Sequence, residues 1–147
     1  MSALSDYLEN KVIDWLLRGQ TFTPPATVYV ALFTTADNDA DSAKVEVSGG
    51  SYARVAVTSS LANWAGTQSA GSTTASTGTG GTTSNNNAIT YPAPSANWGS
   101  IVGMGVYDAS TAGNLLFYAA LTTNKTVNNG DPAPSFAAAA LTLQIDN

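Results

Sequence analysis

The sequence predicts a mainly β protein: an antiparallel β-sandwich or jelly-roll of about seven or eight strands with one N-terminal amphipathic α-helix. Short apolar or alternating segments recur along most of the chain, and segments rich in Gly, Asn, Asp and Pro separate them. No helical pattern lies between these segments, which excludes a parallel α/β sheet. At 147 residues, the chain fits a single domain, residues 1–147.

Residues 3–18 are predicted to form the helix. Their apolar positions recur at three- and four-residue spacing: Leu4, Leu8, Val12, Trp15 and Leu16. Ser2 stands where a capping residue is expected, and Gly19 follows the last turn. An amphipathic stripe of this kind needs a partner, which is either the body of the same chain or a neighbouring protein.

The region 27–147 is predicted to form the β-sandwich. Residues 27–34 are apolar on both faces, as is typical of a central strand. The other predicted strands are residues 44–47, 51–58, 88–91, 100–107, 114–121 and 136–145. Gly49 and Gly50 predict a hairpin-like turn between the segments 44–47 and 51–58.

Residues 66–87 differ in composition from the rest of the chain. They consist almost wholly of Gly, Ser, Thr, Ala and Asn and contain no large apolar side chain. A segment of this composition contributes little to a core. We therefore predict a flexible loop, or one that docks on the outside of the domain.

Composition excludes several classes of function. The chain has no cysteine and no histidine, so disulfides, thiolate chemistry and cysteine-based zinc sites are ruled out. Five basic residues and a net charge of −5 do not suit a nucleic-acid surface. No apolar run approaches the roughly 20 residues that cross a bilayer. The N-terminus lacks a signal-peptide pattern, so we expect a protein made in a cytoplasm, with no membrane partner.

The most site-like motif is an acidic segment with carboxylates at alternate positions, Asp37, Asp39 and Asp41. Such a set can converge on a hard cation such as calcium. An EF-hand loop, however, requires Gly and Glu where this chain has Ser42 and Ser48. A solvated acidic loop without metal is the alternative, and no cofactor is expected.

Catalysis is not expected, because no pair of acids is placed for general acid–base work. Asp108 follows a predicted strand and is typical of a residue that starts a turn. Several aromatic residues are candidates either for stacking on sugars or for filling the core: Trp64, Trp98, Tyr52, Tyr91, Tyr107 and Tyr118. The residues that we expect at a protein interface are Leu4, Leu8, Trp15, Tyr52, Arg54 and Trp98.

Several blocks of the chain resemble a widespread family of small structural proteins of tailed bacteriophages. They are LENK at 8–11, TVYVALFT at 27–34, VSGGSYAR at 47–54, NWG at 97–99, GVYDA at 105–109, GNLLF at 113–117 and LTTNKTV at 121–127. Members are often labelled tail-fibre proteins, and proteins of this size also serve as capsid cement. The resemblance implies a component of the virion, assembled in the cytoplasm of the host bacterium, with no catalytic residues.

Two functions follow from this resemblance. A capsid cement or decoration protein is favoured, because one short domain without repeats has no visible fibre shaft. Its partner is then the major capsid protein or another virion protein, and a homo-oligomer, by guess a trimer, is expected. The alternative is a tail-fibre, tail-tip or baseplate component that recognises a host glycan.

Overall fold

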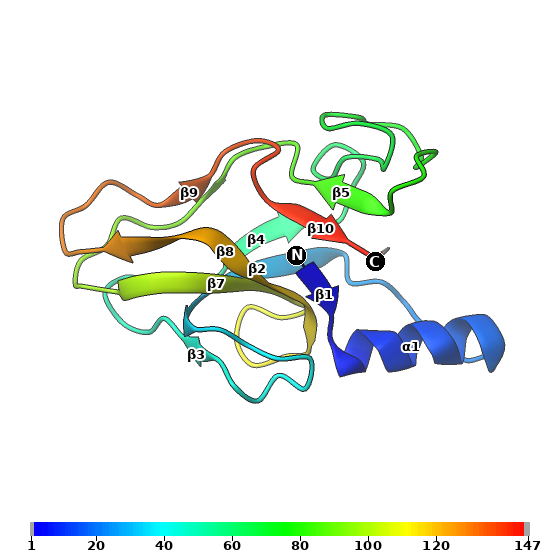
Figure 1. The fold of residues 1–147 in the computed structure, drawn as a ribbon, viewed down its shortest axis with the longest axis horizontal. Helices are drawn as coiled ribbons and strands as arrows, with labels where there is room; N and C mark the ends of the chain where they lie inside the picture. The colour runs from blue at the N-terminus through cyan, green and yellow to red at the C-terminus, as the bar shows by residue number, and fades with distance from the viewer. Residues whose placement is uncertain (1, 146–147) are drawn as a thin grey trace.

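Residues 2–145 are described by the computed structural model of the protein, so residues 1, 146 and 147 of the predicted domain lie outside them. All strand pairings in this part of the chain are antiparallel, which confirms the predicted mainly β fold (Figure 1). The elements are β1 (Ser2–Leu4), α1 (Asp6–Leu17), β2 (Thr27–Thr35), β3 (Val45–Glu46), β4 (Val55–Thr58), β5 (Thr82–Ser84), β6 (Ile89–Thr90), β7 (Gly99–Tyr107), β8 (Leu115–Val127), β9 (Ser135–Phe136) and β10 (Thr142–Gln144).

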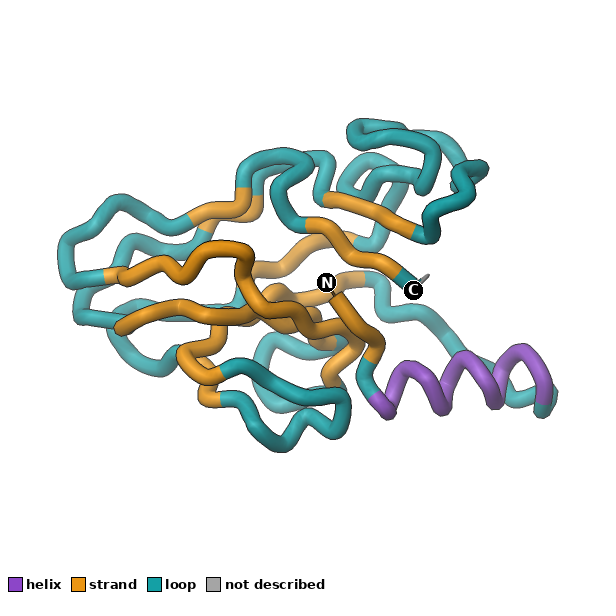
Figure 2. The backbone as a smooth tube through the Cα atoms, viewed as in Figure 1, coloured by secondary structure: helices purple, strands orange, loops and turns teal. Residues whose placement is uncertain are grey.

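The main sheet has the order β1-β8-β7-β2-β3, and β4 also pairs with β2. Two short ladders, β5 with β10 and β6 with β9, lie above it in Figure 2. The larger hydrophobic cluster joins β2, β7 and β8 of the sheet to Ile89, Leu141 and Leu143 of this second layer. The two layers share one core, as a β-sandwich requires.

The central strand β2 is buried on both faces, as its sequence predicts. Val30 and Leu32 point into the larger cluster. Ala31 and Phe33 point to the opposite face, where they pack with Tyr107 and other residues in a smaller cluster. Because side chains alternate along a strand, a strand covered on both sides must be apolar throughout.

The predicted hairpin between the segments 44–47 and 51–58 is wrong. β3 and β4 do not pair with each other; both pair with the same edge of β2, opposite β7. Residues 47–54 connect β3 to β4 and leave a gap in the backbone ladder along this edge of β2. At this gap the Leu32 carbonyl accepts a bond from the Val47 N–H at 3.0 Å, and the Leu32 N–H donates to the Tyr52 hydroxyl at 2.9 Å.

The helix begins later than predicted. The segment before it forms β1, which pairs with the part of β8 around Tyr118, and Ser5 rather than Ser2 caps α1. The predicted end is correct, because Gly19 follows with a φ of +67° that favours glycine. Among the described residues, no helix has the length and apolar character needed to span a bilayer.

The segment 66–87 contains a strand that its composition did not predict. β5 pairs with β10, and the adjoining Asn85 is buried. The Asn85 side chain donates to the carbonyls of Asn87 and Ala137 at 2.8 Å, and it accepts a bond from the Leu141 N–H at 2.9 Å. These bonds attach the end of the segment to the second layer of the domain. The predicted strand 136–145 is split into β9 and β10, and Ala139 lies between them with a φ of +63°.

Candidate functional site

The base of α1 is fixed to the main sheet through Ser5. The buried Ser5 hydroxyl donates to the Leu115 carbonyl and accepts a bond from the Leu8 N–H at 3.3 Å, as a helix cap does. The Ser5 N–H donates to the Leu116 carbonyl at 3.0 Å. Leu8 is buried in the larger cluster and Leu4 packs against it. These two predicted interface residues therefore attach the helix to its own domain.

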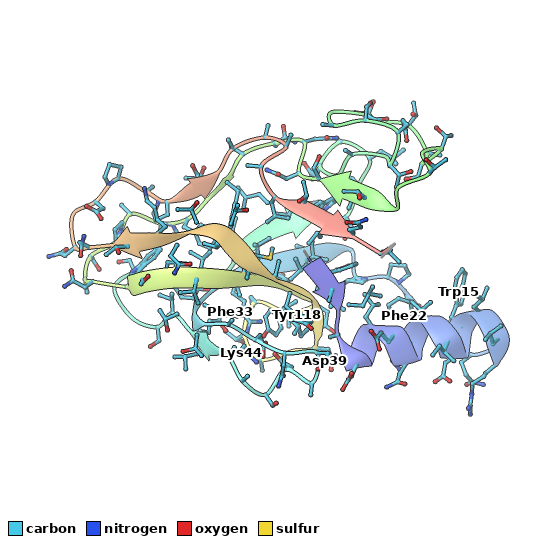
Figure 3. All side chains as sticks on the ribbon, viewed as in Figure 1. Trp15, Phe22, Phe33, Asp39, Lys44 and Tyr118 are labelled. Atoms are coloured by element: carbon cyan, nitrogen blue, oxygen red, sulfur yellow. The ribbon has the colours of Figure 1, made fainter. Side chains whose placement is uncertain are left out.

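The second half of α1 is not covered by the domain. It extends beyond the sheet in Figure 2, and Figure 3 shows Trp15 on this projecting part. The side chains here are 37–76 % exposed, and we call them the helix tip: Val12, Ile13, Trp15, Leu16 and Leu17. A surface helix normally buries its apolar stripe, and a cluster of exposed apolar side chains marks an interaction site.

Arg54, another predicted interface residue, is held inside the domain. Its guanidinium forms two bonds to the Glu46 carboxylate, at 2.7 and 2.8 Å, and lies 3.7 Å from the centre of the Tyr107 ring. It also donates to the carbonyls of Ala109 and Ala112. Burial alone lowers the pKa of Arg54, but its hydrogen bonds and ion pair with Glu46 raise it overall. Arg54 therefore joins the edge of the sheet to the turn between β7 and β8.

Tyr52 and Trp98 also contact their own chain. The Tyr52 hydroxyl donates to Glu46 Oε1 at 2.9 Å, and burial, together with the charge of Glu46, raises the pKa of Tyr52. Trp98 is buried, its ring packs edge-on against Tyr52, and its indole N–H donates to the Gly50 carbonyl at 2.9 Å. Trp98 is thus a core residue and not an exposed anchor.

We expect the Tyr52→Phe substitution to lower the free energy of unfolding by about 1–3 kcal/mol, because the Leu32 N–H loses its acceptor at the gap in the sheet edge. Urea unfolding followed by circular dichroism measures this change. Tyr29→Phe is the control, since no hydrogen bond to the Tyr29 hydroxyl occurs within residues 2–145, and a change below about 0.5 kcal/mol is expected. Equal effects of the two substitutions contradict the role of Tyr52.

The three carboxylates of the predicted calcium site do not converge. Asp37 accepts bonds from the backbone N–H groups of Asn38, Ala43 and Lys44, and Asp41 accepts from the Lys44 ammonium and, at 2.7 Å, from the Tyr107 hydroxyl. The carbonyl of Asp39 instead accepts a bond from the Asp6 N–H. Within the described residues no group of three acids is placed to hold a metal ion.

The Lys44 ammonium provides the positive charge beside Asp37 and Asp41, where the sequence suggested a calcium ion. Its Nζ lies 3.8 Å from Asp37 Oδ2 and contacts Asp41 directly. Burial raises the pKa of Asp37. Burial also acts to raise the pKa of Asp41, but the hydrogen bonds from Lys44 and Tyr107 outweigh it and lower that pKa. The acidic segment is therefore a structural loop that covers the smaller cluster.

A cavity of about 440 Å³ lies between the main sheet and the segment 131–136; we call it the β9 cavity. Three of its lining residues, Leu32, Ile101 and Val127, are apolar and buried. Lys125 and Asp131 are its charged lining residues, and Lys125 forms no ion pair with any described residue. A cavity of this size with an apolar floor and a few polar groups suits an apolar side chain or a small ligand.

Sequence reasoning missed parts of these features for identifiable reasons. The periodicity identified Trp15, and the neighbours Ile13 and Leu17 widen the same stripe, but periodicity does not show that the sheet covers only the first half of the helix. The β9 cavity is formed by a Pro-rich segment that lies over three strands, β2, β7 and β8, and no local pattern in the sequence signals it. The ion pair between Arg54 and Glu46 was missed as well. Glu46 lies in β3 and Arg54 directly precedes β4, and the two residues meet only because both strands pair with β2.

No curated protein matches the chain significantly. A protein-family profile described as podophage GP4 fiber I protein gp80 matches residues 3–144, nearly the whole chain. This match confirms the resemblance to small structural proteins of tailed phages. The chain therefore belongs to the podophage GP4 fiber I protein gp80 family and is a structural component of a bacteriophage particle.

Proposed function

We propose that this protein is a subunit of a phage fibre, held in the particle by contacts with other protein subunits. The observation that carries the proposal is the helix tip, an apolar surface on a helix whose base is fixed to the sheet. Complete burial of one large apolar side chain contributes roughly 1.5–3 kcal/mol. The tip has five such side chains, so a partner that covers them gains enough to offset part of the entropy cost of association. The family description, a fiber protein, supports the same function.

A role without catalysis is part of this proposal. The acids that are best placed for chemistry already serve the fold: Glu46 pairs with Arg54, and Asp41 pairs with Lys44. Asp108 accepts a 2.7 Å bond from the Asn114 N–H, which supports its predicted role in a turn. Tyr91, Tyr107 and Trp98 are buried, so these candidates for stacking on a host glycan are core residues.

Capsid cement is the second candidate. It is favoured by the shape of the domain, because residues 2–145 form one two-layer unit without a repeating shaft. In this role the helix tip contacts the major capsid protein rather than a fibre component. A homo-oligomer, with a trimer as the guess, is compatible with either location.

The number of copies in the virion distinguishes these two functions. Quantitative mass spectrometry of purified virions, with isotope-labelled peptides of this chain and of the major capsid protein, measures the ratio. A fibre subunit is expected at a small fraction of the major capsid protein. A ratio approaching that of the major capsid protein contradicts the fibre and supports the cement.

We expect Leu16→Glu to reduce incorporation of the protein into virions at least several-fold, because a charge at the centre of the tip opposes burial. Leu61→Glu is the matched control: Leu61 is 55 % exposed, close to the 65 % of Leu16, but lies outside the tip. Incorporation is measured by complementing a phage that lacks the gene. Both proteins should retain the wild-type melting temperature within a few degrees, and equal incorporation of the two contradicts the role of the tip.

A further inference from the structure

We propose that Asp37 and Asp41 share one proton, and that this proton keeps the acidic segment, residues 36–44, folded against the sheet. The inference goes beyond the fibre function and does not depend on it. The segment connects β2 to β3, and its Asp39 carbonyl accepts a bond from the Asp6 N–H at 2.9 Å, at the first turn of α1 (Figure 3). Loss of the proton therefore loosens a contact at the base of the projecting helix.

The two oxygens of the Asp37 carboxyl group have different surroundings. Oδ1 accepts bonds from the backbone N–H groups of Asn38, Ala43 and Lys44 at 2.9, 3.3 and 3.2 Å. Oδ2 is buried, and within residues 2–145 no donor lies at hydrogen-bond distance from it. A buried carboxylate oxygen that has lost water without gaining a donor is unfavourable. The same oxygen becomes a donor when it carries a proton.

The Asp41 carboxylate is the acceptor for this proton. The side chains of Asp37 and Asp41 lie within hydrogen-bond reach of each other. Two ionised carboxylates cannot bond in this way, because neither has a donor. Asp41 is the member that stays ionised, since the Lys44 ammonium contacts it and the Tyr107 hydroxyl donates to it at 2.7 Å. Asp37 is then the protonated member, as in other pairs of acids that occupy one site.

Lys44 does not neutralise Asp37 as it does Asp41. Its Nζ lies 3.8 Å from Asp37 Oδ2, too far for a hydrogen bond, and its direct contacts are the Asp41 carboxylate and, at 3.2 Å, the Asp41 carbonyl. Burial is the largest influence on Asp37 and raises its pKa, although the backbone N–H bonds act to lower it. The other titratable or charged groups around the pair are Asp39 on the same segment, Asp6 on α1, Tyr107 on β7, Tyr118 on β8 and Arg54, which lies over the Tyr107 ring.

The shared proton makes stability depend on pH in the sense opposite to that of an ordinary ion-paired acid. Because the pKa of Asp37 is raised in the folded chain, its contribution is complete below the ordinary value of 3.8 and is lost as the pH rises through the folded pKa. Between these two pKa values the ratio of folded to unfolded protein falls about tenfold for each pH unit. The pKa of Asp41 is lowered, so the contribution of Asp41 is lost only as the pH falls below 3.8.

Urea unfolding of the full-length wild type and of Asp37→Asn, over about pH 4 to 8, tests the inference. The Asn side chain keeps an oxygen for the three backbone N–H groups, and its amide donates to Asp41 at every pH. The folded-to-unfolded ratio of Asp37→Asn, divided by that of the wild type, should rise about tenfold per pH unit up to the folded pKa of Asp37 and stay constant above it. Asp39→Asn is the matched control, because Asp39 is exposed in the same segment, and it should show no such rise.

Two further measurements accompany the urea experiment. The side-chain carboxyl carbon of Asp37 in the wild type, followed by NMR, should titrate above 3.8. Protection of the Asp6 N–H from hydrogen exchange, corrected for the intrinsic rate, should fall with rising pH in the wild type and not in Asp37→Asn. Three results overturn the inference: an Asp37 that titrates at or below 3.8, a stability ratio that is constant or falls with pH, or equal Asp6 protection in the two proteins. If Asp37→Asn does not fold, the carbon titration decides alone.

Discussion

The Arg54→Met protein should unfold with a free energy about 3 kcal/mol below that of the wild type, the lower end of the effect of breaking a buried ion pair. Met has a similar length but leaves the Glu46 carboxylate without its partner in a largely buried position. The carbonyls of Ala109 and Ala112 lose their donor as well. The effect stays at the lower end because Glu46 keeps some access to water. Urea denaturation monitored by tryptophan fluorescence measures the change.

Arg18→Met provides the matched control for this prediction. The Asp14–Arg18 pair has a similar distance, 2.9 Å, but the Arg18 side chain is 72 % exposed where that of Arg54 is 6 %. Exposed pairs contribute about 0–1 kcal/mol, so little change is expected. In addition, Glu46→Gln should partly rescue Arg54→Met, because it removes the unpaired charge. Losses of equal size at the two arginines contradict the structural role of the buried pair.

The Gly105→Ala protein is expected to lose about 2–3 kcal/mol, the upper part of the range for overpacking a core. A Cβ at this position lies 2.5 Å from Phe33 Cζ and 2.9 Å from Leu115 Cδ1. Phe33 belongs to the central strand, is fully buried and packs edge-on against the Tyr107 ring, so its ring has little room to move. Thermal and urea unfolding of the purified protein measure the loss.

Gly80→Ala is the control for this substitution, because its Cβ meets nothing within 4 Å and its backbone is not in the left-handed region. A neutral or slightly stabilising effect is expected there, through the lower entropy of the unfolded chain. Phe33→Leu should relieve part of the loss in Gly105→Ala, since the smaller side chain leaves the contact. A Gly105→Ala protein as stable as the wild type shows that the glycine is not required by packing.

The elements that the sequence predicted well are those whose local pattern agrees with their surroundings. β2 is apolar on both faces and is covered on both faces, and β7 matches its predicted range closely. The family resemblance was confirmed over nearly the whole chain. The elements that were missed depend on distant partners. β1 has three residues and exists because β8 lies beside it, and the polar β5 is a strand only through its bonds to β10.

The candidate site could be predicted only in part. Periodicity correctly placed an apolar stripe on the N-terminal helix, but the division into a buried base and an exposed tip depends on where the sheet ends. Tyr52, Arg54 and Trp98 have the chemistry of interface residues, and the same chemistry serves equally well for closing a gap in a sheet edge. Acids at alternate positions suggested a metal, whereas the actual partner, Lys44, is determined by the path of the loop.

The interruption between β3 and β4 limits how other chains can pair with this edge of the main sheet. An exposed, continuous edge strand is a template on which other chains add strands and aggregate. Here that edge consists of pieces of two and four residues, and the Tyr52 hydroxyl occupies the Leu32 N–H between them. A strand of another chain therefore finds no long continuous ladder to join at this edge, and contacts made there depend on side chains rather than on backbone pairing.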